Sequence, residues 1–206
     1  GVASEQYLER MTMTDRRRWV DMRGDGAVAA MRALAHVCDD DAWLRTHSTA
    51  LQNMTQSPYR LVRHAVFPLL ARLQPDLVER TLKHGRDAHI VRAALEHVSH
   101  DASHCAAERI RLLGHDTMCV CALRSVEGLS LSSLATHAVA LYNVAIHTPV
   151  HSDEDPALGV KVRIAHHIRA IARAGIVDVD RSRVEGVLAR FDRYVCVRVA
   201  YVALLQ

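Results

Sequence analysis

Three histidines lie close together in the sequence and are of a residue type that binds zinc. His97, His100 and His104 follow one another at intervals of three and four residues, which places side chains on one face of a continuous helix. Three imidazoles on one face could hold a borderline metal such as zinc. Ser99 to Asp101, however, is typical of one helix ending and a new N-cap beginning. We therefore expect the histidines to diverge across a turn and to bind no metal.

The cysteines lack the spacing of a zinc site and indicate a reduced protein. A single residue separates Cys119 from Cys121, whereas the cysteines of structural zinc sites are about two to four residues apart. The chain contains five cysteines, an odd number, in apolar helical contexts. A secreted disulfide scaffold would have denser and paired cysteines. We predict core thiols and an intracellular protein, cytoplasmic or nuclear.

The sequence contains none of the short motifs that carry catalysis. It has no Gly-rich phosphate loop, no Gly-x-Ser-x-Gly elbow, and no Cys or Ser nucleophile with a convincing partner. His166 and His167 are adjacent on a predicted helix, so one should be buried and the other exposed. A triad assembled from distant residues would leave no such pattern and stays open. We expect a protein that is not an enzyme and has no cofactor.

Arginines form two groups that could contact a polyanion. Arg16, Arg17 and Arg18 directly precede Trp19, which gives a compact basic cluster beside an aromatic ring. The second group could line successive helices as a stripe on one surface: Arg63, Arg92, Arg124, Arg163 and Arg198. Arginines at such positions also bridge neighbouring helical repeats through carboxylates and carbonyls, and acidic residues on both sides offset the first cluster. Both groups are candidate partner-binding residues.

Helices must position these residues, because apolar side chains recur at helical spacing along most of the chain. Val62, Val66, Leu69 and Leu73, for example, line one face of residues 59–73. Aromatic residues make up only 4% of the sequence, and nine glycines and five prolines are few, which argues against a β-sandwich or barrel. We predict an all-α protein of about twelve short helices without a sheet.

Five of the predicted helices share one sequence pattern. They fall in residues 57–73, 86–98, 115–129, 159–175 and 192–205. Aligning them on a central valine brings together Val62, Val91, Val120, Val162 and Val197, at intervals of 29, 29, 42 and 35 residues. Such intervals suit stacked pairs of antiparallel helices, with the polar loop 148–159 as an insertion. We predict that these valines are buried between helices.

On this pattern the chain resembles HEAT-like or armadillo-like helical repeats, whose second helix opens with Asp and carries Val-Arg five and six residues later. Asp192, Val197 and Arg198 match it, whereas Ser57 replaces the Asp before Val62 and Arg63. The resemblance covers residues 25–206, with 1–24 as an N-terminal helical segment. It implies a right-handed α-solenoid of about five to six helix pairs and a tendency to bind partners. A HEAT-like dinuclear-iron hydroxylase uses His-Glu pairs as ligands, and no His-Glu dipeptide occurs here.

The charge of the chain is mildly positive. The formal net charge is +3, because 23 acidic residues accompany 26 basic ones, and this is no signature of DNA binding. The resemblance therefore implies a non-catalytic scaffold or adaptor that binds a protein or peptide on its concave face. The alternative is a nucleic-acid-binding repeat protein that uses the arginine stripe.

Two apolar segments bear on membranes and partners. Residues 128–152 contain no Asp, Glu, Lys or Arg, but their Ser, Thr, His and Asn side chains would be costly in lipid, so we expect a buried helix and no membrane contact. Residues 197–206 are apolar on more than one side, although a solenoid normally ends in a repeat with a polar outer face. We expect this end to continue into a longer chain, or to dock onto a partner or a second copy.

Overall fold

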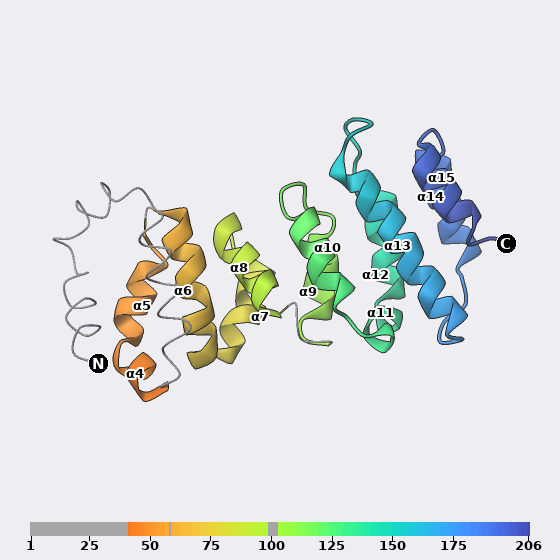
Figure 1. The fold of residues 1–206 in the computed structure, drawn as a ribbon. Helices are drawn as coiled ribbons and strands as arrows, with labels where there is room; N and C mark the ends of the chain where they lie inside the picture. Colours follow the sequence, from red (N-terminus) through yellow and green to blue (C-terminus); the bar gives the residue numbers. More distant parts are fainter. Residues whose placement is uncertain (1–40, 58, 99–102) are drawn as a thin grey trace. The chain divides into compact units, whose positions relative to one another are not determined.

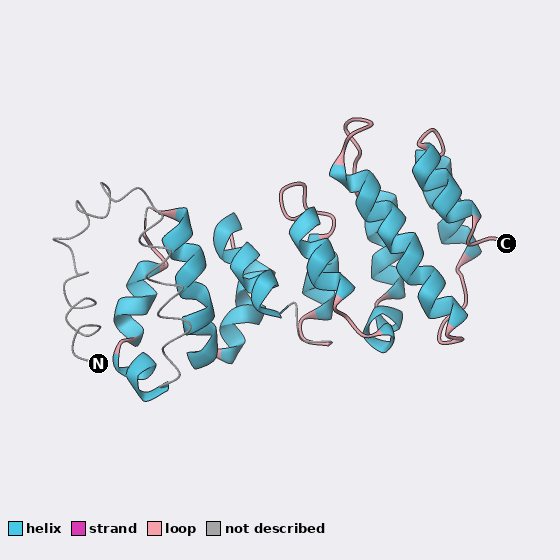
Figure 2. Ribbon diagram, viewed as in Figure 1, coloured by secondary structure: helices cyan, strands magenta, loops and turns pink. Residues whose placement is uncertain are grey.

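The computed structural model describes residues 41–57, 59–98 and 103–206. Over these residues the chain consists of helices and loops, without a strand (Figure 2), which confirms the all-α prediction. None of the described helices is long and apolar enough to cross a membrane. The basic cluster Arg16, Arg17, Arg18 and Trp19 lies outside the described residues, as does the predicted segment 1–24.

The chain forms two compact units, residues 1–94 and 95–206, and each is described by itself. In the first unit, α4, α5 and α7 each pack against α6. Its apolar core contains Leu44, Leu51, Val66, Leu69 and Leu70. The described helices that begin in this unit are α4 (Asp41–Thr46), α5 (Ser48–Met54), α6 (Arg60–Leu73), α7 (Pro75–His84) and α8 (Ala88–Val98).

The second unit contains two rows of helices. Its helices are α9 (Ala106–Leu112), α10 (Cys119–Glu127), α11 (Leu131–Thr136), α12 (Ala138–His147), α13 (Pro156–Arg173), α14 (Arg181–Phe191) and α15 (Val195–Val202). In one row α13 lies between α10 and α15 (Figure 1), and in the other α12 contacts both α9 and α14. Each helix of the first row packs on one of the second, as the pairs α9 with α10, α12 with α13 and α14 with α15. We call the first the α10–α13–α15 row.

Side-chain caps fix where several of these helices begin. The Asp155 carboxylate accepts a hydrogen bond from the Ala157 amide, 2.8 Å away, and Pro156 occupies the first turn of α13, where its missing N–H costs nothing. Residues 156–159 of the predicted loop are therefore helical. Asp180 caps α14 in the same way, through the Arg183 amide.

One core position of the second unit holds a charged side chain. Lys161 of α13 is fully buried, and its Nζ donates to the carbonyl oxygens of Ala145 and Thr148. These acceptors belong to the last turn of α12 and its C-cap, where carbonyls lack helical partners. The Tyr201 hydroxyl of α15 in turn donates to the Lys161 carbonyl at 3.1 Å. Lys161 thereby joins three helices at one point.

The predicted burial of the five aligned valines is only partly right. Val62, Val91 and Val197 are buried, whereas Val162 is half-buried and Val120 is 47% exposed. The alignment is wrong for Val120, because α10 turns the side of Cys119, Ala122 and Val126 toward the core. In α13 the neighbouring core position is taken by Lys161, which leaves Val162 at the edge.

Candidate functional site

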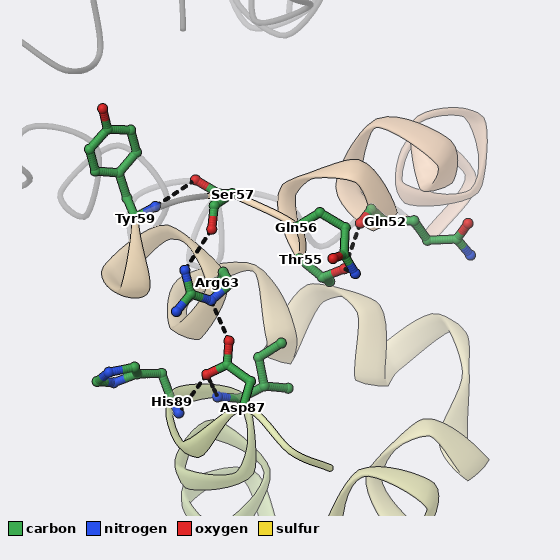
Figure 3. Close-up of polar contacts among 9 residues, drawn as sticks. Gln52, Thr55, Gln56, Ser57, Tyr59, Arg63, Asp87 and His89 are labelled. Atoms are coloured by element: carbon green, nitrogen blue, oxygen red, sulfur yellow. Dashed lines mark hydrogen bonds and ion pairs between the residues drawn. The ribbon is translucent and has the colours of Figure 1, made fainter. Parts of the chain in front are cut away.

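Arg63 of the predicted stripe is engaged within the first unit. Its side chain is 18% exposed, its Nε donates to the Asp87 carboxylate, and its Nη1 donates to the Ser57 carbonyl at 2.6 Å (Figure 3). The same carboxylate caps α8 by accepting from the His89 amide at 2.8 Å. Arg63 thus connects the chain before α6 with the start of α8. This agrees with the alternative that arginines at these positions join neighbouring helices through carboxylates and carbonyls.

Asp87 carries the negative charge of this connection. Burial by itself raises the pKa of the Asp87 carboxyl, but the amide of His89 and the guanidinium of Arg63 outweigh it, so the pKa lies below its ordinary value. Arg92, on α8, is half-buried, and its Nε is shielded from solvent without a hydrogen-bond partner. Arg63 and Arg92, the two arginines of the predicted stripe in the first unit, are thus both half-buried.

The other three arginines of the stripe lie on the three helices of one row. Arg163 of α13 is exposed, with its Nε 3.5 Å from a carboxylate oxygen of Glu127 on α10. Arg198 of α15 is exposed and 4.0 Å from Asp192. Arg124 of α10 is exposed. Exposed pairs at such distances stabilise little, so all three guanidinium groups are available to solvent and to a ligand.

Each helix of this row repeats one pattern of exposed positions. The first, fifth and eighth residues of a stretch are exposed, which is the spacing of a single helix face. We define these nine residues as the row surface: Val120, Arg124 and Glu127 on α10, Gly159, Arg163 and His166 on α13, and Val195, Val199 and Val202 on α15. Val195 and Val199 are each 62% exposed. The row surface therefore combines exposed aliphatic side chains with arginines.

The row surface lies on helices that are strongly basic. α10, α13 and α15 together contain one acidic residue, Glu127, and six basic ones, of which Lys161 is buried. Acidic residues nearby stand in the loops between helices, for example Asp116, Asp153 and Asp192. The helices of the other row, α9, α12 and α14, contain five basic and two acidic residues, so the helices of both rows carry an excess of positive charge.

His166 and His167 divide as the sequence predicts for adjacent helical residues. His166 is exposed on the row surface, whereas the Nε2 of His167 is shielded from solvent. Burial lowers the pKa of His167, although the Glu127 carboxylate acts in the opposite direction. His167 is thus neutral at neutral pH, and Arg124 and Arg163 supply the charge of this part of the row surface.

Of the three histidines considered as metal ligands, the structure describes His97 and His104. His100 lies outside the described residues, and repulsion from His104 adds to burial in lowering the pKa of His97. Among the residues that are described, no group of three His, Cys, Asp or Glu side chains could hold a metal ion. Cys119 is buried, which raises the pKa of its thiol, and Cys121 is a half-buried free thiol.

The aromatic side chains of the second unit are all internal over its described residues. Tyr142, Phe191, Tyr194 and Tyr201 are buried, so none is presented for stacking on a nucleic-acid base. The small depression beside Tyr142 is lined by Ile168 and Ile171 and is too small for a substrate. The row surface combines exposed apolar and charged groups on three helices of this unit.

The C-terminal segment 197–206 is partly covered by its own fold. Tyr201 and Leu204 are buried, whereas Val199 and Val202 face solvent. The exposed valines belong to the row surface, which sequence reasoning did not define, because it aligned Val120 as a core residue. The spacing of Val195, Val199 and Val202 is the signal that could have revealed it.

Comparison of the chain with protein-family models, curated proteins and solved structures found no match.

Proposed function

We propose that the chain is a non-catalytic scaffold or adaptor that binds a protein partner on its row surface. The observation that carries the proposal is the exposure of valines on the two helices that flank α13, at Val120 of α10 and at Val195 and Val199 of α15. Removing aliphatic surface from water is favourable by about 25 cal/mol per Å², and exposed apolar groups rimmed by charge are typical of protein interfaces. The arginines beside the valines can fix the orientation of a bound partner through charge complementarity.

We further propose that the helix pairs are HEAT-like repeats and that the row surface is the concave face of an α-solenoid. Support comes from the pairs α9 with α10, α12 with α13 and α14 with α15, in which the second helix always belongs to the same row. The bond between Arg63 and Asp87 supports it too, because an arginine after a valine there joins α6 to the residue that caps α8. Stacked repeats of this kind bind partners along the inner helices.

Nucleic-acid binding is the second candidate function. It is favoured by the excess of basic residues in the α10–α13–α15 row, because phosphate contacts depend on Lys and Arg. The row surface, however, places valines beside its arginines, and valines gain nothing from a phosphate backbone. Its lack of an exposed aromatic residue among the described positions also removes the stacking contacts on which single-strand binding depends.

A photo-crosslinking experiment tests the proposed function. A photoreactive amino acid in place of Val199 should capture a protein, whereas the same group in place of Glu185, exposed on α14 of the other row, should not. The captured protein, once purified, should bind the unmodified chain and lose binding to Val199→Asp. Equal capture from both positions, or capture of nucleic acid alone, would contradict protein binding at the row surface.

A further inference from the structure

A glycine interrupts the side chains of the row surface without a structural reason. Gly159 is the fourth residue of α13 and is exposed, and a Cβ atom built on it would meet no atom within 4 Å. Glycine destabilises a helix relative to alanine. Gly159 is not in the left-handed region that favours glycine. Neither backbone conformation nor packing within the chain therefore requires glycine at this position.

The neighbouring helices bear valines where α13 bears this glycine. Val120 on α10 and Val195 on α15 occupy the equivalent exposed positions, and both are large apolar side chains open to solvent. The row surface thus has no side chain at Gly159, and the two helices that contact α13 carry exposed valines. Such a place lets a bound segment approach the helix backbone closely and cover both valines at once.

Positive charge begins one turn farther along the same helices. Arg124 of α10 and Arg163 of α13 occupy the next equivalent positions of the row surface. Arg163 is more than half exposed in spite of its 3.5 Å approach to Glu127. That glutamate is the single acidic residue of the three helices, and the exposed Asp116, Asp153 and Asp192 lie before the helices begin, so carboxylates of a ligand pair with the arginines one turn into the helices.

We propose that the partner segment is an acidic amphipathic peptide of another protein, and this rests on the proposed function. Its apolar side chains pack on Val120, Gly159 and Val195, and its carboxylates pair with Arg124 and Arg163. A complementary ligand needs both apolar and acidic groups, because this surface carries valines on α10 and α15 and arginines on α10 and α13. A phosphate backbone satisfies only the arginines and leaves the valines in water.

The experiment is selection of a displayed library of random peptides on the full chain. Two variants provide the comparison. Gly159→Leu adds a large side chain where the Cβ atom itself would meet no neighbour, and Ser182→Leu introduces a leucine at an exposed position of α14. Peptides retained by the wild type and Ser182→Leu but lost on Gly159→Leu are expected to combine Asp or Glu with large aliphatic residues. Arg163→Glu should lower the affinity of these peptides for the chain about tenfold or more, and tenfold equals about 1.4 kcal/mol.

The possible results separate the two proposals. Enrichment of neutral or basic peptides that Gly159→Leu excludes would overturn the acidic partner and leave protein binding at the row surface intact. Retention of the same peptides by Gly159→Leu would overturn the docking position, while capture at Val199 would still decide the proposed function independently. A short DNA duplex that displaces the selected peptides and binds more tightly than they do would overturn the peptide in favour of nucleic acid.

Discussion

The ammonium group of Lys161 lies 3.7 Å from the centre of the Phe191 ring, inside the second unit. This cation–π contact joins α13 to the end of α14, while the same Nζ closes the carbonyl end of α12. No carboxylate forms an ion pair with it among the described residues, although Asp155 exerts a weak attraction from a distance. The lysine is therefore held in the core by carbonyls and a ring, which compensate incompletely for lost hydration.

The stability of the protein should rise with pH as Lys161 loses its proton. Burial, together with repulsion from Arg190, lowers the pKa of Lys161 to about 8, against about 10.4 in an unfolded chain. Between these values the unfolded state binds the additional proton, so the free energy of unfolding increases with pH. Relative to Lys161→Met, the wild type should gain about 2–3 kcal/mol from pH 8 to 10.

Urea unfolding at a series of pH values measures this gain. The comparison with Lys161→Met cancels the titration of other groups, including Tyr201, whose pKa is raised by burial. Parallel curves for the two proteins between pH 8 and 10 would show that the lysine is not desolvated as described.

The exposed and buried sides of α15 should respond very differently to a charge. Val197 is fully buried and Val199 is 62% exposed on the same helix. Val197→Asp should destabilise the protein by roughly 3 kcal/mol or more, since an unpaired charge would enter the core. Val199→Asp should change stability by about 0.5 kcal/mol or less. Thermal unfolding of both variants checks the orientation of α15, and similar losses of stability would refute it.

The contribution of the Arg63–Asp87 ion pair to the stability of the protein should decrease as the pH is lowered. Because the pKa of Asp87 is lowered in the fold, the carboxylate contributes stability above its unfolded pKa of about 3.9, and this is lost as pH falls through the folded value. Asp87→Asn retains an N-cap but loses the charge. The substitution should lower the free energy of unfolding by about 1 kcal/mol at pH 7 and leave it unchanged at pH values below the folded pKa of Asp87. Acid titration followed by circular dichroism tests it; a pH-independent cost would indicate lost capping alone.

The helical fold could be predicted from the sequence, whereas parts of the core and of the candidate surface could not. Apolar residues at helical spacing are sufficient for an all-α prediction, and Val62, Val91 and Val197 are indeed buried. Lys161 is an exception to the helical pattern of apolar residues in the core. From the sequence alone a lysine is assigned to the surface unless its partners are known. Those partners are backbone carbonyls of another helix, which no side-chain pattern encodes.

The place of Gly159 inside α13 is a second feature that the sequence does not predict. Gly159 is the last residue of the predicted loop 148–159 and the first of the predicted helix 159–175. The capping bond from the Ala157 amide to Asp155 begins α13 three residues earlier, so that the glycine stands within a helix. The assignment of its neighbours Val120 and Val195 to a common surface depends on how three helices lie side by side, which is tertiary information.

A single methyl group at Gly159 should stabilise the fold and weaken the partner at the same time. Alanine exceeds glycine in helix stability by about 0.5–1 kcal/mol, and the added Cβ of Gly159→Ala meets no neighbour, so thermal unfolding should shift upward. Gly186→Ala on α14 is the matched control, because its Cβ would make an ordinary 3.6 Å contact with Ile146. Both variants should be stabilised, but only Gly159→Ala should lose affinity, severalfold, for an acidic amphipathic peptide selected on the wild type. Fluorescence anisotropy of the labelled peptide measures this, and equal affinities for the two variants would show that the glycine has no part in binding.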